Sequence, residues 1–166
     1  MSIPRIVASV LTFPGVIIHE LGHKIFCNLL GVRVYKVCYF RFGQPAGYVI
    51  HEFPHWFSQS FFISVGPLIT GTIIAGLSFQ LSKNFLPTTY GHWLLIWFGL
   101  AVAMDSFPSC GDAKTLWQAT NKNVTKNLLA LIGYPVILLL WLINNLSIIW
   151  LDLIYALVLF ELIAVR

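Results

Sequence analysis

Apolar runs of membrane-spanning length recur along this chain of 166 residues. A helix needs about 20 mostly apolar residues to cross the hydrocarbon core of a bilayer. Charged residues make up only 10% of the chain, whereas a surface that faces water normally carries about 25%. We therefore expect an integral membrane protein, folded in the lipid bilayer as a single domain over residues 1–166.

Five segments are predicted to cross the membrane as helices, with the ranges 6–30, 57–81, 92–107, 127–143 and 146–165. Pro14-Gly15 predicts a kink in the first of them. The last two segments are joined by Asn144-Asn145, and they can be two spans or one broken element.

Residues 32–53 interrupt the helical pattern. β-Branched and aromatic residues fill both halves of this segment, and the run Gly43-Gln44-Pro45-Ala46-Gly47 separates them. That pattern predicts a β-hairpin lying against the bundle. The expected fold class is an all-α polytopic membrane protein of about five transmembrane helices, with a β-hairpin between the first and second.

Lysine and arginine are unevenly divided between the two sides of the predicted bundle. One side carries Arg33, Lys36, Arg41, Lys114, Lys122, Lys126 and Arg166, and the other carries Arg5 and Lys83. Cytoplasmic loops are enriched in these residues, so we predict a cytoplasmic hairpin and C-terminus and an external N-terminus. The net charge of +4 thus indicates membrane topology rather than nucleic-acid binding.

The first predicted helix contains the run His19-Glu20-Leu21-Gly22-His23. Residues four apart share a helical face, so both imidazoles can bind one zinc ion. Glu20 can accept a proton from a zinc-bound water, which is then the nucleophile, and can later protonate a leaving amine. Ionisable side chains inside an apolar helix are costly and usually functional. The pattern predicts Zn²⁺ as the cofactor and Glu20 as the catalytic base.

A second run, His51-Glu52-Phe53-Pro54-His55, has the same spacing. Proline is tolerated only in the first turn of a helix, and the residues before His51 are predicted as strand. The two imidazoles of this run would not share a helical face, so we do not expect them to be the metal pair.

A catalytic zinc site requires a third protein ligand and an open position. Asp112 follows the third predicted span on the cytoplasmic side, and His23 lies about 12 Å inside the same end of its helix. A loop through residues 108–111 that dips toward the bilayer can bring Asp112 to that depth, provided that it lines a water-filled cavity. Asp105, about two helical turns deeper, is the alternative third ligand.

Across residues 6–115, these features resemble the site-2 protease family of intramembrane zinc metalloproteases. That family has His-Glu-x-x-His in its first core helix, a Gly-Pro element in the next, and Asn-x-x-Pro…Leu-Asp-Gly in the third. The first motif is complete here, and Gly66-Pro67 is similar to the second, with Thr70 where the family often has Asn. The third is partial: Pro108 matches, Asp105 stands at the Asn position, Asp112 falls one residue before the metal-binding Asp, and Ala113 replaces Gly.

The resemblance implies hydrolysis of peptide bonds in membrane-anchored protein substrates by a small, divergent prokaryotic member in the cell membrane. It also implies that the hairpin, here Val32 to Ile50, presents the substrate as an added β-strand; a purely structural hairpin is the alternative. A non-catalytic membrane metal-binding protein or an ion carrier is the alternative function. Neither the substrate's identity nor the oligomeric state follows from the sequence.

Overall fold

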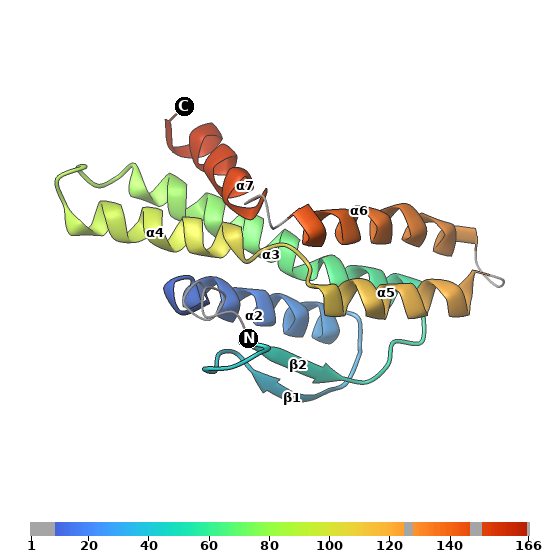
Figure 1. Cartoon of the computed structure of the whole chain (residues 1–166). Coiled ribbons are helices and arrows are strands. Elements are labelled where there is room, and N and C mark those ends of the chain that lie inside the picture. The colour runs from blue at the N-terminus through green and yellow to red at the C-terminus, as the bar shows by residue number, and fades with distance from the viewer. Residues whose placement is uncertain (1–8, 125–127, 147–150, 166) are drawn as a thin grey trace.

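A computed structural model describes residues 9–124, 128–146 and 151–165. These residues are mostly helical, with one two-stranded antiparallel sheet. The elements, in chain order, are α2 (Phe13–Leu29), β1 (Val34–Cys38), β2 (Tyr48–His51), α3 (Phe57–Ser82), α4 (Tyr90–Met104), α5 (Cys110–Asn123), the 3₁₀ segment η1 (Leu128–Ile132), α6 (Gly133–Leu146), α7 (Leu151–Phe160) and the π-helical turn η3 (Glu161–Val165). Figure 1 shows their arrangement.

Three helices, α2, α3 and α4, pack against one another and carry most of the candidate site. Helix α2 approaches α3 closely because Gly22 has no side chain at the contact. A Cβ atom added there would lie 2.8 Å from the Cα atom of Pro67, well inside van der Waals contact. This crossing brings the end of the His19 to His23 run directly against the middle of α3.

The predicted hairpin is confirmed. Strands β1 and β2 pair antiparallel, with Val37 opposite Val49 and Cys38 opposite Tyr48. The sheet lies along α2, with β2 nearer the helix and β1 on the outside (Figure 1). Both strands contact α2, the helix that carries the His19 to His23 run.

The predicted segments 57–81 and 92–107 correspond to α3 and α4. Within the described ranges, α3 is the one helix long and apolar enough to cross a membrane, while α4 and residues 130–142 form shorter apolar helices. The first predicted segment differs at its start. Residues 9–11 are helical and Thr12 is a turn, and helix α2 then begins at Phe13 with Pro14 in its first turn, where proline is well tolerated. The predicted first segment is therefore interrupted just before this proline.

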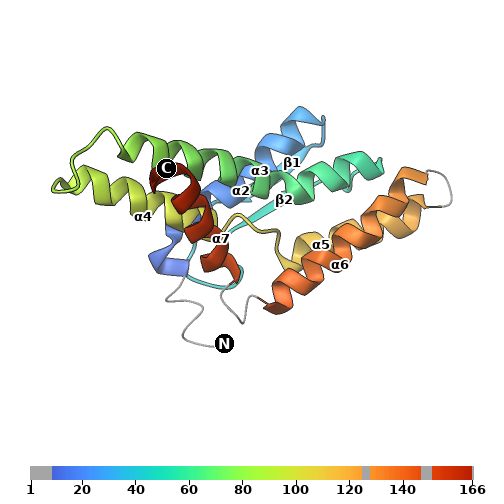
Figure 2. The same cartoon turned by 90° about the horizontal axis from the view of Figure 1, so that it is seen from above.

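Residues 110–123 form α5, a helix that the sequence pattern did not predict. Farther along, α6 and α7 are separate helices that run in different directions (Figure 2). Parts of the predicted first, fourth and fifth segments lie outside the described residues, as do Arg5, Lys126 and Arg166.

Candidate metal centre

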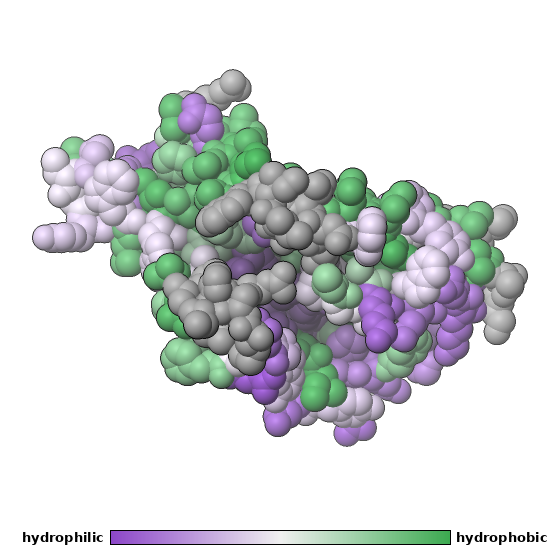
Figure 3. All heavy atoms as spheres, viewed as in Figure 1, coloured by the Kyte–Doolittle hydropathy of each residue, from purple (hydrophilic) through white to green (hydrophobic). Residues whose placement is uncertain are grey.

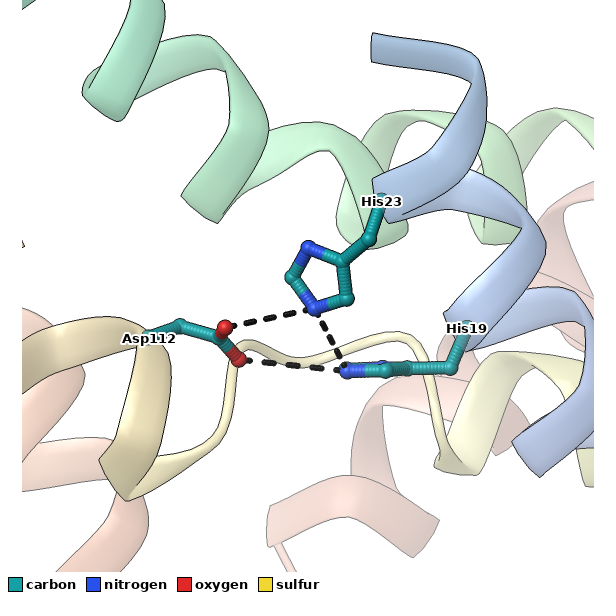
Figure 4. A group of neighbouring side chains, drawn as sticks. All are labelled: His19, His23 and Asp112. Atoms are coloured by element: carbon teal, nitrogen blue, oxygen red, sulfur yellow. Dashed lines mark hydrogen bonds and ion pairs between the residues drawn. The ribbon is translucent and has the colours of Figure 1, made fainter. Parts of the chain in front are cut away.

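Three side chains from two distant parts of the chain converge at the candidate metal centre (Figure 4). The Nε2 atoms of His19 and His23 lie 3.2 Å apart. Asp112 approaches both rings, with Oδ1 at 3.2 Å from Nε2 of His23 and Oδ2 at 3.8 Å from Nε2 of His19. One ligand atom from each residue falls within 4.8 Å of the other two.

Backbone carbonyls hold the other nitrogen of each imidazole. Nδ1 of His19 donates to the carbonyl of Asp105 at 2.7 Å, and Nδ1 of His23 donates to the carbonyl of Ile63 at 2.9 Å. A carbonyl only accepts, so each Nδ1 carries the proton, and a neutral ring then presents a bare lone pair at Nε2. Two nitrogen lone pairs and a carboxylate thus face one point, and a cation is the partner that satisfies all three.

The spacing of these atoms fits a small divalent metal ion. Ligands bound tetrahedrally at about 2.0–2.1 Å from an ion lie about 3.3 Å from one another. The two Nε2 atoms, 3.2 Å apart, are close to that distance, and Asp112 approaches the two rings through different oxygens, at 3.2 Å and 3.8 Å. The residues present therefore fit a three-ligand centre that keeps a further position open.

The start of α5 delivers the Asp112 carboxylate. Ser109 is the N-cap of this helix, and both its backbone N–H and its hydroxyl donate to Oδ2 of Asp112, at 2.7 Å and 2.6 Å. Two donors on one oxygen favour the ionised form of a carboxyl group and fix the orientation of this candidate ligand.

Asp105, the alternative third ligand, has a different position. It caps the C-terminal end of α4 and contributes its backbone carbonyl to His19. Its carboxyl group is not part of the cluster of ligand atoms, and its Oδ2 atom is buried without a hydrogen-bond partner in the described part of the chain. The structure thus brings Asp112, and not the Asp105 side chain, to the two histidines.

The metal centre opens into a cavity of about 680 Å³. Glu20 lies in its wall and is only 8% exposed. The hairpin forms the opposite wall through residues 45–49 and His51. Contact between the walls is tight at Gly47, where an added Cβ atom would lie 2.6 Å from Cγ and 2.8 Å from Oε1 of Glu20. The cavity therefore combines a candidate metal centre, a buried carboxyl and a strand.

The second His-Glu-x-x-His run does not form a comparable pair. His51 ends β2 and lines the cavity, whereas His55 is exposed in the segment before α3. The nearest acid to His55 is Glu52, at 3.9 Å. These two histidines thus lie on different kinds of structure, as the proline between them predicts.

The roles of three supporting residues at the site were missed in the sequence analysis. Ser109, three residues before an acidic residue, matches a capping-box pattern that signals the start of a helix. Pro67, inside a predicted helix, signals a free carbonyl four residues earlier, at Ile63. No local signal marks Gly47, because its contact with Glu20 depends on how the hairpin folds back.

Comparison with protein-family models, curated proteins and solved structures finds no match to this chain. The fold and the site by themselves define a mostly helical protein with a candidate His-His-Asp metal centre.

Proposed function

We propose that the chain is an intramembrane zinc metalloprotease of the site-2 protease type. The observation that carries this proposal is the convergence of His19, His23 and Asp112 with both Nδ1 atoms already bonded to carbonyls. Two imidazoles and one carboxylate, with one position open, form a ligand set used by catalytic zinc. A zinc ion bound there supplies a Lewis acid that activates water for attack on a peptide carbonyl.

Glu20 is the group in the cavity suited to move the proton. It follows His19 directly in α2 and shares the cavity with the three candidate ligands, but it is not one of them. Its carboxylate can accept a proton from the attacking water and pass it to the amine that leaves, which is the role of a general base and acid. The protein thus supplies the proton transfer and the orientation of both reactants.

The outer surface supports a location in the membrane. Helix α3 presents Ile69, Ile73, Leu77 and Leu81 at four-residue spacing, and these side chains are 37–58% exposed. Helices α4 and α7 also expose large apolar side chains, including Trp93, Leu94, Ile154, Leu157 and Val158. Figure 3 shows hydrophobic side chains over α7 and hydrophilic ones over α5 and the hairpin. Lipid is the environment that suits such an exterior, so we propose a polytopic protein of the cell membrane, with the hairpin on the cytoplasmic side.

Strand β2 is the proposed docking edge for the substrate. Its residues Tyr48, Val49 and His51 line the cavity, and β1 occupies only one of its two edges. A substrate helix hides its peptide bonds until it unwinds, and an unwound segment can pair with a free strand edge. The substrate class is therefore a membrane-anchored protein whose helix opens beside the metal centre.

The described residues fit a protein that keeps one bound metal ion better than an ion carrier. Within the ranges that the structure describes, one group of three potential ligands is found, whereas an ion path needs ligands at several depths. This favours the protease over an ion carrier.

The proposal is tested by comparing membrane-protein fragments from cells that express the wild-type chain or Glu20→Gln. Mass spectrometry of protein termini should find new ends within or beside apolar spans in the wild-type cells only. Identical sets of termini in the two samples would contradict a proteolytic function.

We expect Gly47→Ala to slow cleavage at least about tenfold while leaving metal content unchanged. The added methyl group overlaps the Glu20 side chain and pushes it from its place beside the metal ligands, and small misplacements of catalytic groups are costly. Gly43→Ala is the matched control, since its nearest neighbour is the Nε atom of Arg41 at 3.8 Å. Rates and zinc content are measured together; equal rates for the two variants would exclude this contact.

A further inference from the structure

Pro67 interrupts the hydrogen bonds of α3 beside the metal centre. In an unbroken α-helix, the N–H of residue 67 donates to the carbonyl of residue 63. Proline has no N–H, so the carbonyl of Ile63 lacks this helical partner. That same carbonyl accepts the hydrogen bond from Nδ1 of His23 at 2.9 Å.

The packing of α2 on α3 lets His23 take the place of the missing N–H donor. Gly22 precedes His23, and a Cβ atom added to it would lie 2.8 Å from Cα and 3.0 Å from N of Pro67. The helices thus touch at the interrupted turn, which places the imidazole within reach of the released carbonyl. Ile63 is 3% exposed, so a protein donor is needed to satisfy this group.

We propose that Pro67 is a positioning residue for the metal centre. Because proline has no N–H, the Ile63 carbonyl is free to accept a hydrogen bond from His23. This hydrogen bond keeps the proton on Nδ1 and orients Nε2 toward Asp112. His19 is held in the same manner by Asp105, whose carbonyl belongs to the end of α4. Hydrogen bonds of this kind set the tautomer and the orientation of metal-binding histidines.

Two substitutions at position 67 separate the missing N–H from the shape of the ring. Pro67→Ala restores an N–H that competes for the Ile63 carbonyl, and we expect zinc affinity to fall about 10- to 100-fold. Replacing Pro67 with lactic acid, the ester analogue of alanine, removes that N–H again and should return the affinity to the wild-type value. Affinity is measured by competition with a zinc chelator, independently of any cleavage.

Several outcomes would overturn the role of Pro67. Wild-type affinity in Pro67→Ala would do so, and so would an equal loss in the alanine and ester variants, because the ring would then matter and not the N–H. If Pro67→Ala does not fold, ¹⁵N NMR of the metal-free wild-type protein tests the proposal by identifying the tautomer of His23. The proposal requires the Nδ1–H tautomer, and a predominant Nε2–H tautomer would contradict it.

A different surface carries a second inference. An open depression of about 650 Å³ lies between the C-terminal half of α2 and strand β1. Lys24, Arg33 and Lys36 line it, and its lining contains no acidic residue. Strand β2 lines the cavity of the candidate metal centre, whereas β1 lines this depression.

The cations of this depression contact aromatic groups. The guanidinium of Arg33 lies 5.7 Å from the ring centre of Tyr35, Nζ of Lys36 lies 5.8 Å from that of Tyr48, and Nζ of Lys24 donates to the Tyr39 hydroxyl at 3.1 Å. Across residues 9–124, 128–146 and 151–165, the ion pairs of acidic side chains are with histidine, not with lysine or arginine. The positive charge of this surface therefore remains available to an external anion.

We infer that the depression binds the headgroup of an anionic phospholipid. The inference rests on the proposed membrane location, since basic residues with neighbouring aromatic rings are typical of the cytoplasmic membrane interface. No residue of β2, the proposed docking strand, lines the depression, which favours a lipid over the acidic segment of a substrate. The three cations are opposite in charge to the phosphate group, and the exposed Tyr35 ring provides an interfacial contact.

Native mass spectrometry of the detergent-solubilised full chain tests this site with dioleoyl phosphatidylglycerol and dioleoyl phosphatidylcholine at equal concentration. The wild-type chain should retain the anionic lipid preferentially. Each of K24Q, R33Q and K36Q should weaken that retention about fivefold, and the triple variant should lose the preference. The matched control K83Q/K114Q removes two positive charges elsewhere and should retain it.

Equal retention of the two lipids by the wild-type chain would overturn the site, as would an unchanged preference in the triple variant. Displacement of the anionic lipid by an equal concentration of inorganic phosphate or of an acidic peptide would point to a different ligand and would also overturn it. The single variants keep the test decisive if the triple variant does not fold. Zinc content and cleavage are unaffected by this outcome, so its failure is distinguishable from failure of the protease proposal.

Discussion

Glu20→Gln is expected to abolish peptide-bond cleavage while the metal stays in place. Glutamine has nearly the same shape, but its amide cannot accept the proton of an attacking water. General base catalysis contributes about 10²- to 10⁴-fold to rates, so residual activity should be near background. Zinc should remain because the ligand atoms belong to His19, His23 and Asp112.

Cleavage rate and zinc content are measured on the same purified samples, with a substrate taken from the comparison of cellular fragments. Glu52→Gln is a matched control, since this carboxylate lies at the end of the hairpin, where it approaches His55 at 3.9 Å, and does not line the cavity. We expect it to cleave at the wild-type rate. If Glu20→Gln cleaved at the wild-type rate, Glu20 would not be the catalytic base. If Glu20→Gln lost zinc, Glu20 would instead be a metal ligand.

Asp112→Ala is expected to lose the metal, whereas Asp105→Ala retains it. The first substitution removes one of three protein ligands and leaves two imidazoles. Even partners of the ligands change metal affinity 10- to 100-fold, so loss of a ligand should exceed about 100-fold. The second substitution keeps the backbone carbonyl that holds His19 and removes only a carboxyl group outside the cluster of ligand atoms.

Chelator competition on the two aspartate variants gives these affinities directly. Asp112→Asn preserves the size of the side chain and removes its charge. We expect Asp112→Asn to weaken zinc binding less than Asp112→Ala does. Loss of zinc in Asp105→Ala alone would reverse the assignment of the third ligand. Equal affinity in both variants and the wild type would place the metal elsewhere.

The parts of the fold that depend on local residue patterns could be predicted from the sequence. The hairpin at residues 32–53 and the helix at 57–81 follow from residue types that favour strand and helix, and both are present with small changes of boundary. The spacing of His19 and His23 put both imidazoles on one helical face, and the structure places their Nε2 atoms 3.2 Å apart.

The start of α5 was harder to predict because a cap, and not an apolar period, determines it. Residues 110–123 are polar enough to read as a loop, yet Ser109 and Asp112 together form a capping box. This cap sets the angle at which the carboxylate enters the cavity.

Contacts between segments far apart in the chain could not be predicted from the sequence. The carbonyl of Ile63 meets His23 only because Gly22 lets α2 cross α3 at Pro67. Similarly, Gly47 meets Glu20 only because the hairpin turns back along α2. Such contacts depend on the packing of elements that are individually predictable, and no local periodicity encodes them.

X-ray absorption at the zinc edge, combined with metal analysis of the purified wild-type chain, tests the central claim most directly. The proposed function predicts one zinc ion per chain, bound by two imidazole nitrogens and a carboxylate oxygen at about 2.0–2.2 Å. A chain without zinc would contradict this account. So would a zinc site dominated by sulfur at about 2.3 Å, because it would assign the metal to Cys27, Cys38 or Cys110 instead of His19, His23 and Asp112.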